Sequence, residues 1–266
     1  MLKDITIGQY FPGKSVIHRM DPRVKILLSL AYIVMLFVAG TGWGLALGLV
    51  FAFACYGIGR IPVRMILRGL KPILPIIIFT ALLNMLFVQG DPIWHWWIIT
   101  VTWQGISTAV FMAVRIVCLI AGTSLLTYTT SPIALTDGIE RLLGPLKAVH
   151  LPVHELAMMM TIALRFIPTL IEETDKIMSA QKARGADMET GGLMQRAKAL
   201  IPILIPLFVS AFRRADELAL AMVCRCYHGG EGRTRMRQLQ LSFADFGGSV
   251  ITTLVFAAVI MLNILL

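Results

Sequence analysis

The chain has 266 residues, of which 57% are hydrophobic and 15% charged, with a mean hydropathy of +0.79 and a formal net charge of +9. Soluble globular domains hold about 45–50% apolar and about 25% charged residues, so this composition excludes that class, and it excludes disorder as well. The sequence predicts an all-α integral membrane protein, and the places of its Lys and Arg residues decide what the positive charge means.

The first 25 residues precede the first apolar run. Charged residues, glycines and a proline interrupt them before an apolar core can form, so we expect no signal peptide here. Asp21, Pro22 and Arg23 close this stretch. An Asp followed by a Pro is typical of a capped helix start, so we assign these three residues a structural role at the start of the first span.

Five apolar runs are candidates for membrane spans. Residues 26–59 contain no charged side chain, and a glycine-rich break at 40–44 divides them into two halves. Each half is near the lower limit of about 17–25 residues that a transmembrane helix needs. The other three spans are expected at residues 72–88, 105–127 and 247–266.

The basic residues predict the orientation. Lys and Arg gather before the first span, between the second and third, and after the fourth. These are the cytoplasmic segments of a five-span chain with its N-terminus inside and its C-terminus outside. A segment without Lys or Arg holds Trp94, Trp96, Trp97 and Trp103, and it is typical of an aromatic belt at the outer interface. Topology thus accounts for the net charge, and we expect no nucleic-acid partner.

Arg115 is the one basic residue that this topology places inside a span. An ionisable group at membrane depth is costly and needs partners. The expected spans contain no Asp or Glu, so backbone carbonyls, Asn84 and an acidic residue of the cytoplasmic part all remain open as partners. We expect a structural role for Arg115.

Residues 131–245 are predicted to form a cytoplasmic domain between a membrane domain at 1–130 and a final transmembrane helix at 246–266. Two of its segments, 156–170 and 199–212, are strongly apolar but too short to span. We expect two long helices that include these segments and end near Arg184 and Arg225, with a break at Gly191-Gly192. They would lie at the inner leaflet or pack against another membrane protein.

An offset of 41 residues reveals a weak repeat within these two helices. It aligns Asp175 with Asp216, Ala180 with Ala221, Ala183 with Cys224, and Arg184 with Arg225. A helix that ends in a cation and a Gly is also ordinary capping chemistry. The second copy of the arginine favours two equivalent docking partners or the halves of a pseudo-symmetric one.

These features resemble the transmembrane coupling component, or T component, of energy-coupling factor (ECF) transporters, which import vitamins and metals in prokaryotes. The resemblance rests on Asp21 to Arg23, the tryptophans at 94–97, ALRFIPTL at 163–170, AQKARGAD at 180–187 and GRTR at 232–235. It implies an L-shaped protein of about five transmembrane helices and two cytoplasmic coupling helices. It also implies a non-enzymatic scaffold in the prokaryotic cell membrane that passes the motion of two ABC-type ATPase subunits to one substrate-binding membrane subunit, shared or dedicated.

The resemblance further assigns the ends of the two coupling helices to ATPase docking. The implied residues are Ala183, Arg184 and Gly185 in the first copy and Cys224, Arg225 and Cys226 in the second. ATP and Mg would bind the partners, and no cofactor this chain. Cys226 stands where the family usually has Gly, so we expect a different cap there, with Gly229-Gly230 in that role.

A second surface is expected at the start of the first coupling helix. Met158, Met159, Met160 and Leu164 form an adaptable apolar surface that would dock the substrate-binding subunit, with plain helix packing as the alternative.

Other functions remain as alternatives. A stand-alone secondary transporter or an intramembrane hydrolase would need ionisable or catalytic groups at membrane depth, of which the spans offer few. An ordinary ABC permease is a further alternative. Cys224, Cys226 and His228 invite a metal site, but their spacing on a helix end points them in different directions. No Gly-rich phosphate loop is present, so we expect no ATPase activity and no catalytic residues.

Overall fold

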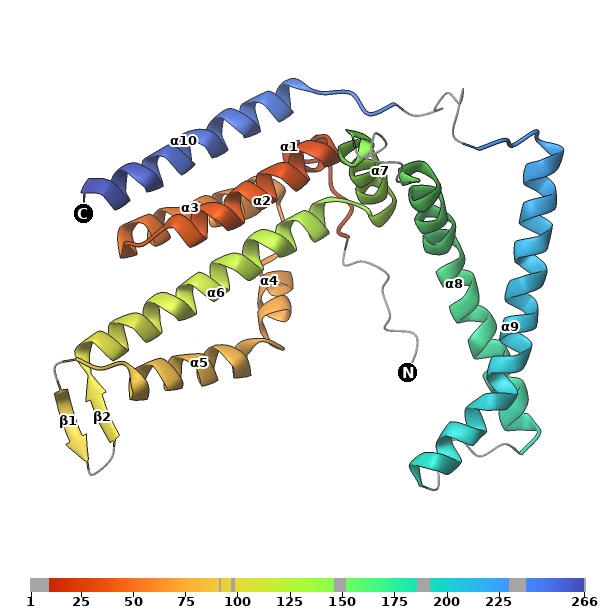
Figure 1. Cartoon of the computed structure of the whole chain (residues 1–266), viewed down its shortest axis with the longest axis horizontal. Coiled ribbons are helices and arrows are strands. Elements are labelled where there is room, and N and C mark those ends of the chain that lie inside the picture. Colours follow the sequence, from red (N-terminus) through yellow and green to blue (C-terminus); the bar gives the residue numbers. More distant parts are fainter. Residues whose placement is uncertain are drawn as a thin grey trace. The chain divides into compact units, whose positions relative to one another are not determined.

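The computed structural model describes residues 10–90, 92–96, 99–145, 152–185, 192–229 and 238–265, except for the side chains of 92–96, 99–101, 193 and 195–197. The described chain is almost entirely helical, which confirms the all-α class (Figure 1). Packing divides it into two compact units. One holds the described residues up to 138 together with 238–265, and the other holds those between 139 and 229.

The first unit begins with the short helix α1 (Val16–Arg19) and a helical hairpin, α2 (Pro22–Val38) and α3 (Gly42–Gly59). The side chain of Asp21 caps α2 by accepting from the amide of Arg23, and Pro22 begins the helix, as the sequence indicates. The break between the halves is shorter than expected. Thr41 caps α3, so the glycines at 42 and 44 belong to the helix.

The expected third span at 72–88 corresponds to a single short helix, α5 (Leu74–Phe87), and a further helix, α4 (Val63–Leu70), precedes it at a sharp bend. The two helices meet at 60°. α5 has 14 residues and is about 21 Å long, less than the hydrocarbon core of a bilayer, so only the pair together has the length of a span.

A two-stranded antiparallel sheet, β1 (Pro92–Trp96) and β2 (Ile99–Thr102), follows where only an aromatic loop is expected. Aromatic and β-branched residues favour this hairpin. It leads into α6 (Trp103–Thr129), along whose first half α5 packs (Figure 1). Trp103 is 66% exposed, whereas the side chains of the three earlier tryptophans lie outside the described residues.

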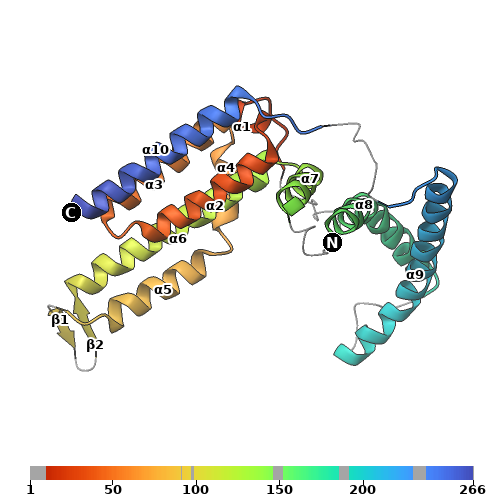
Figure 2. The same ribbon diagram turned by 45° about the horizontal axis from the view of Figure 1, so that its top comes forward.

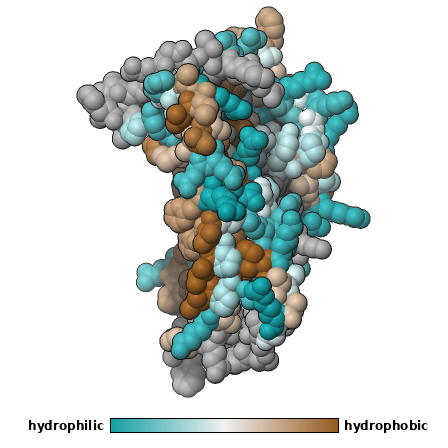
Figure 3. Space-filling model, turned by 90° about the vertical axis from the view of Figure 1, so that its right-hand side faces the viewer, coloured by the Kyte–Doolittle hydropathy of each residue, from teal (hydrophilic) through white to brown (hydrophobic). Residues whose placement is uncertain are grey.

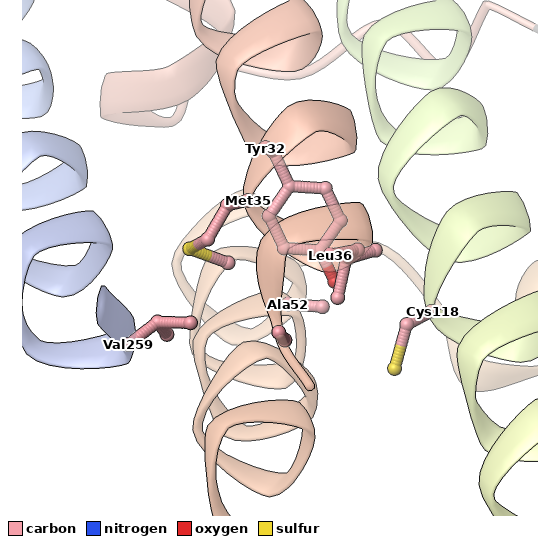
Figure 4. Packing of buried hydrophobic residues seen from close by; sticks show 7 residues of the cluster. Tyr32, Met35, Leu36, Ala52, Cys118 and Val259 are labelled. Atoms are coloured by element: carbon pink, nitrogen blue, oxygen red, sulfur yellow. The ribbon is translucent and has the colours of Figure 1, made fainter. Parts of the chain in front are cut away.

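The core of this unit joins helices from both ends of the chain. Figure 4 shows Tyr32, Met35, Leu36, Ala52, Cys118 and Val259, which come from α2, α3, α6 and the last helix, α10 (Phe243–Leu265). The ring of Tyr32 lies against Gly122, where a Cβ atom would fall 2.3 Å from a ring carbon. Its hydroxyl donates to the carbonyl of Gly48 on α3 (3.1 Å). Through Val259, α10 packs against the hairpin of α2 and α3 (Figure 2).

Four described helices have the length and composition of membrane spans, namely α3, α6, α10 and α8 (Val153–Ala183), and the bent pair makes a fifth. α2, with 17 residues, is one residue shorter than the shortest of these.

The second unit consists mainly of two long helices, α8 and α9 (Leu193–Cys224), with the end of α7 (Pro132–Leu142). α9 runs back across α8, as Figures 1 and 2 show. Pro168 lies inside α8, and Pro202 and Pro206 lie inside α9. Despite these prolines, each helix is continuous from its apolar first half to the predicted end near the arginine. Of the expected break at 191–192, Gly191 lies outside the described residues.

Candidate functional site

The first candidate docking motif is the C-terminus of α8. The helix ends at Ala183, and Arg184 is its C-cap residue. Gly185 follows with φ +84°, and its amide donates to the carbonyl of Lys182 (3.0 Å). This is the left-handed cap that glycine favours, and it leaves the cap arginine on the outside of the helix end.

The second motif has the same geometry at the end of α9. Cys226 adopts φ +54°, and its amide donates to the carbonyl of Val223 (2.9 Å). The amide of Tyr227 donates to the carbonyl of Met222 (3.1 Å), which completes a Schellman cap. The expectation of a different cap at Gly229-Gly230 is therefore wrong: hydrogen bonds to the last turn hold Cys226 in the conformation of Gly185, despite its Cβ atom.

Both motif arginines are exposed at equivalent helix ends. Among the residues that the structure describes, neither forms an ion pair. A cation at a helix C-terminus is favourable beside the last carbonyls, and a guanidinium offers five donors to an incoming carboxylate. Arg184 and Arg225 are thus two exposed cations at helix ends, a position from which a guanidinium can pair with a carboxylate.

Polar contacts join the two helices where they cross. Arg214 of α9 donates to a carboxylate oxygen of Glu173 on α8 (3.0 Å), and the hydroxyl of Ser210 donates to the other oxygen. Nearer the end of α8, the Gln181 side chain donates to the carbonyl of Pro202 (3.3 Å). These contacts fix the register in which the two helices cross.

The apolar surface of this unit is broader than expected. Met159 and Met160 are 54% and 46% exposed, while Met158 and Leu164 are half-buried. The sequence indicates that residues 199–212 face the membrane or another protein, but it does not single out the four residues of α9 that are 59–68% exposed, namely Ile205, Phe208, Val209 and Phe212. Their spacing of three and four residues places them on one helix face, which is the signal that could have identified them. Figure 3 shows a band of apolar residues flanked by hydrophilic ones.

The described residues contain no cluster of three metal-ligating side chains. Cys224 and Cys226 are exposed free thiols, and Nδ1 of His228 lies 2.8 Å from the carbonyl oxygen of Cys226. This arrangement gives no support to a metal site at the end of α9.

The structural residues at the start of α2 form a buried polar junction. Asp21 accepts two hydrogen bonds from the Arg23 guanidinium, at 3.0 and 2.7 Å. Lys25 is only 7% exposed and donates to the carbonyl of Thr129 at the end of α6 (2.9 Å), so it caps that helix. Asp245 of α10 belongs to the same junction, and sequence reasoning missed it because its partner lies at the other end of the chain.

Arg115 bonds the backbone, which confirms the first of its three possible partners. Its Nη2 donates to the carbonyl of Ala39 at the end of α2 (2.6 Å), and its guanidinium lies 4.6 Å from the ring centre of Phe111. Asn84 instead bonds the carbonyl of Thr80 on its own helix. Arg115 thus ties α6 to the α2–α3 turn.

A cavity of about 360 Å³ lies within the first unit, among α1, α2, α3, α6 and α10. Lys25 is the one charged residue among the described residues that line it, and its Nζ atom is engaged by backbone and hydroxyl oxygens. The remaining lining is largely apolar, so this cavity does not suit a charged solute.

Comparison with known proteins gives a consistent result. Residues 13–236 match the family model CbiQ, described as cobalt transport protein. The chain is 58% identical over 252 residues to the energy-coupling factor transporter transmembrane protein EcfT of Clostridium kluyveri, covering 94% of this chain and 93% of that protein. It is 53% identical to EcfT of Ruminiclostridium cellulolyticum (99% and 98% covered) and 45% identical to EcfT of Lactococcus lactis (100% and 97% covered).

Proposed function

The chain belongs to the CbiQ family and is a multi-pass transmembrane component of a prokaryotic ECF transporter, and from this premise we propose how it acts. It is a scaffold that binds two ATPase subunits through the ends of α8 and α9. It passes their ATP-driven motion to a separate membrane subunit that binds a vitamin or another micronutrient.

The observation that carries this proposal is the pair of matching helix ends. Arg184 and Arg225 are both exposed, both follow a complete helix and both precede a residue with positive φ. Two equivalent ends suit two equivalent partners. Small neighbours, Ala183 and Gly185 in one copy and two cysteines in the other, let each end enter a groove.

The exposed apolar face of α8 and α9 supports docking of the substrate-binding subunit. Large apolar side chains such as Phe208 and Phe212 are costly to leave in water, so this face lies against membrane or protein. The methionines of α8 extend the surface with flexible side chains that adapt to more than one partner.

In this proposal the ATPase subunits hydrolyse ATP, so the chain itself needs no catalytic groups and no cofactor. ATP and Mg bind the ATPase subunits, while the apolar cavity among the spans argues against a stand-alone transporter of a charged solute. The distribution of Lys and Arg along the chain supports an orientation with the N-terminus inside and the C-terminus outside.

Affinity purification from the native membrane in mild detergent tests the proposal. We expect two ATPases per chain and at least one small hydrophobic subunit in the purified complex, identified by mass spectrometry. Purification of the chain alone, together with solute uptake by proteoliposomes that contain only this chain, would refute it.

A further inference from the structure

The repeat that aligns Arg184 with Arg225 also aligns Glu173 with Arg214, because 41 residues separate each pair. Glu173 and Arg214 are also the two residues that meet across the helix crossing, at 3.0 Å. A residue that contacts its own equivalent lies on the two-fold axis that relates the two copies. The ion pair therefore marks a pseudo-two-fold axis between α8 and α9.

The charges at this axis follow from the symmetry. Identical charges that meet on a two-fold axis repel each other, so a symmetric crossing needs opposite charges at the equivalent positions. Glu173 and Arg214 have this inversion at the point where they meet. Their neighbours Glu172 and Arg213 are exposed and do not take part in this contact. The hydroxyl of Ser210 supports Glu173 from the side of α9.

The two segments that lead from the ion pair to the docking arginines, here called the docking arms, have the same length. Glu173 stands 11 residues before Arg184, and Arg214 stands 11 residues before Arg225. At 1.5 Å per residue each docking arm is about 17 Å long, and both docking arms are helical up to the residue before the arginine. A small change in the crossing angle is therefore enlarged at the two arginines.

We propose that Glu173 and Arg214 are positioning residues that set the crossing of α8 and α9 and hence the spacing of the two docking arginines. This inference rests on the proposed function, because spacing matters only if each arginine holds one ATPase. The pair is partly exposed, with 22% of the Glu173 side chain and 35% of the Arg214 side chain accessible, so it can adjust as the ATPases move. Its role is to define geometry more than to add stability.

A distance measurement on the full chain in nanodiscs, without partners, tests the positioning role directly. Spin labels at Ser179→Cys and Leu220→Cys report the spacing, because these exposed residues are equivalent in the repeat and lie beyond the crossing. The exposed thiols are first removed by Cys224→Ala and Cys226→Gly.

We expect Glu173→Gln and Arg214→Gln each to broaden and shift the distance distribution between the two labels. The swap of Glu173→Arg with Arg214→Glu should restore a narrow one.

Glu172→Gln and Arg213→Gln are the matched controls, because they change the same charges at exposed neighbours. An unchanged distribution in both variants of the pair, or a shift as large in the controls, would overturn the inference. Uptake by the assembled transporter should fall several-fold in the Gln variants and recover in the swap, with ATPases still bound. If the wild-type chain binds no ATPase, the proposed function fails, while the distance result still decides whether the pair sets the crossing.

Discussion

The backbone amide of Asp21 donates a 2.7 Å hydrogen bond to a carboxylate oxygen of Asp245, 224 residues further along the chain. The other oxygen of Asp245 accepts from the amide of Ser242 (2.7 Å), which precedes α10, in the manner of a capping box. One buried carboxylate thus joins the starts of α2 and α10, and it holds the last helix against the first hairpin.

Replacement of this carboxylate should loosen the first unit. In Asp245→Ala, two amides lose their acceptor, and Asp21 and Asp245 are both less than 5% exposed, so we expect a loss of about 1–3 kcal/mol in unfolding free energy. Asp245→Asn keeps one acceptor oxygen and should lose less. Thermal unfolding in detergent measures the difference. Asp216→Ala, at an exposed position of α9, is the control and should leave the midpoint unchanged.

The left-handed cap at Cys226 predicts a stabilising substitution. A non-glycine residue at φ +54° carries a penalty of about 1–2 kcal/mol, so Cys226→Gly should raise the stability of the α9 end by about 1 kcal/mol. Gly185→Ala should have the opposite effect on α8. No atom lies within 4 Å of the added Cβ, so the cost there is conformational alone.

Amide hydrogen exchange of the last turn of each helix measures these two changes. Cys224→Ala is the control, since residue 224 is helical and carries no such penalty. Faster exchange at the end of α9 in Cys226→Gly would contradict the assigned cap.

The sequence predicts the helices whose limits are set by local signals. Asp21 with Pro22 marks the start of α2, and the two arginine motifs mark the ends of α8 and α9. It does not predict α4 or the 60° bend between α4 and α5, because Arg64, Arg68 and Lys71 indicate a cytoplasmic loop before the third span. The β1–β2 hairpin is missed for a similar reason: tryptophans dominate its composition and suggest an interface loop.

The sequence likewise predicts some residues of the candidate site and not others. The docking arginines follow from a repeated motif, but the Glu173–Arg214 contact needs the crossing geometry, which no local pattern contains. Likewise, Asp245 reads as an ordinary residue before a span until the structure places Asp21 beside it.

Substitutions on the apolar face of α9 should weaken binding of the substrate-binding subunit without weakening binding of the ATPases. Phe208→Glu and Phe212→Glu together place charges in a surface proposed to be buried by the substrate-binding subunit, so they should reduce its co-purification at least tenfold. The ATPases, which dock at the helix ends, should remain bound. Leu220→Glu, at an exposed apolar position beyond the crossing, should leave the substrate-binding subunit in place. Equal loss in all variants would mean that this face is not a specific docking surface.

The two docking arginines give the most direct test of the coupling role. An arginine that anchors an interface typically contributes about 2–4 kcal/mol, so Arg184→Ala and Arg225→Ala should each weaken ATPase binding by about 30-fold or more. The double variant should nearly abolish uptake, because neither coupling helix then transmits motion, while membrane insertion stays intact. Arg165→Ala and Arg213→Ala remove exposed arginines from the same helices away from their ends and should keep binding and uptake. Wild-type uptake in the double variant would remove the docking role from these residues, because the charge at the helix ends would then be dispensable.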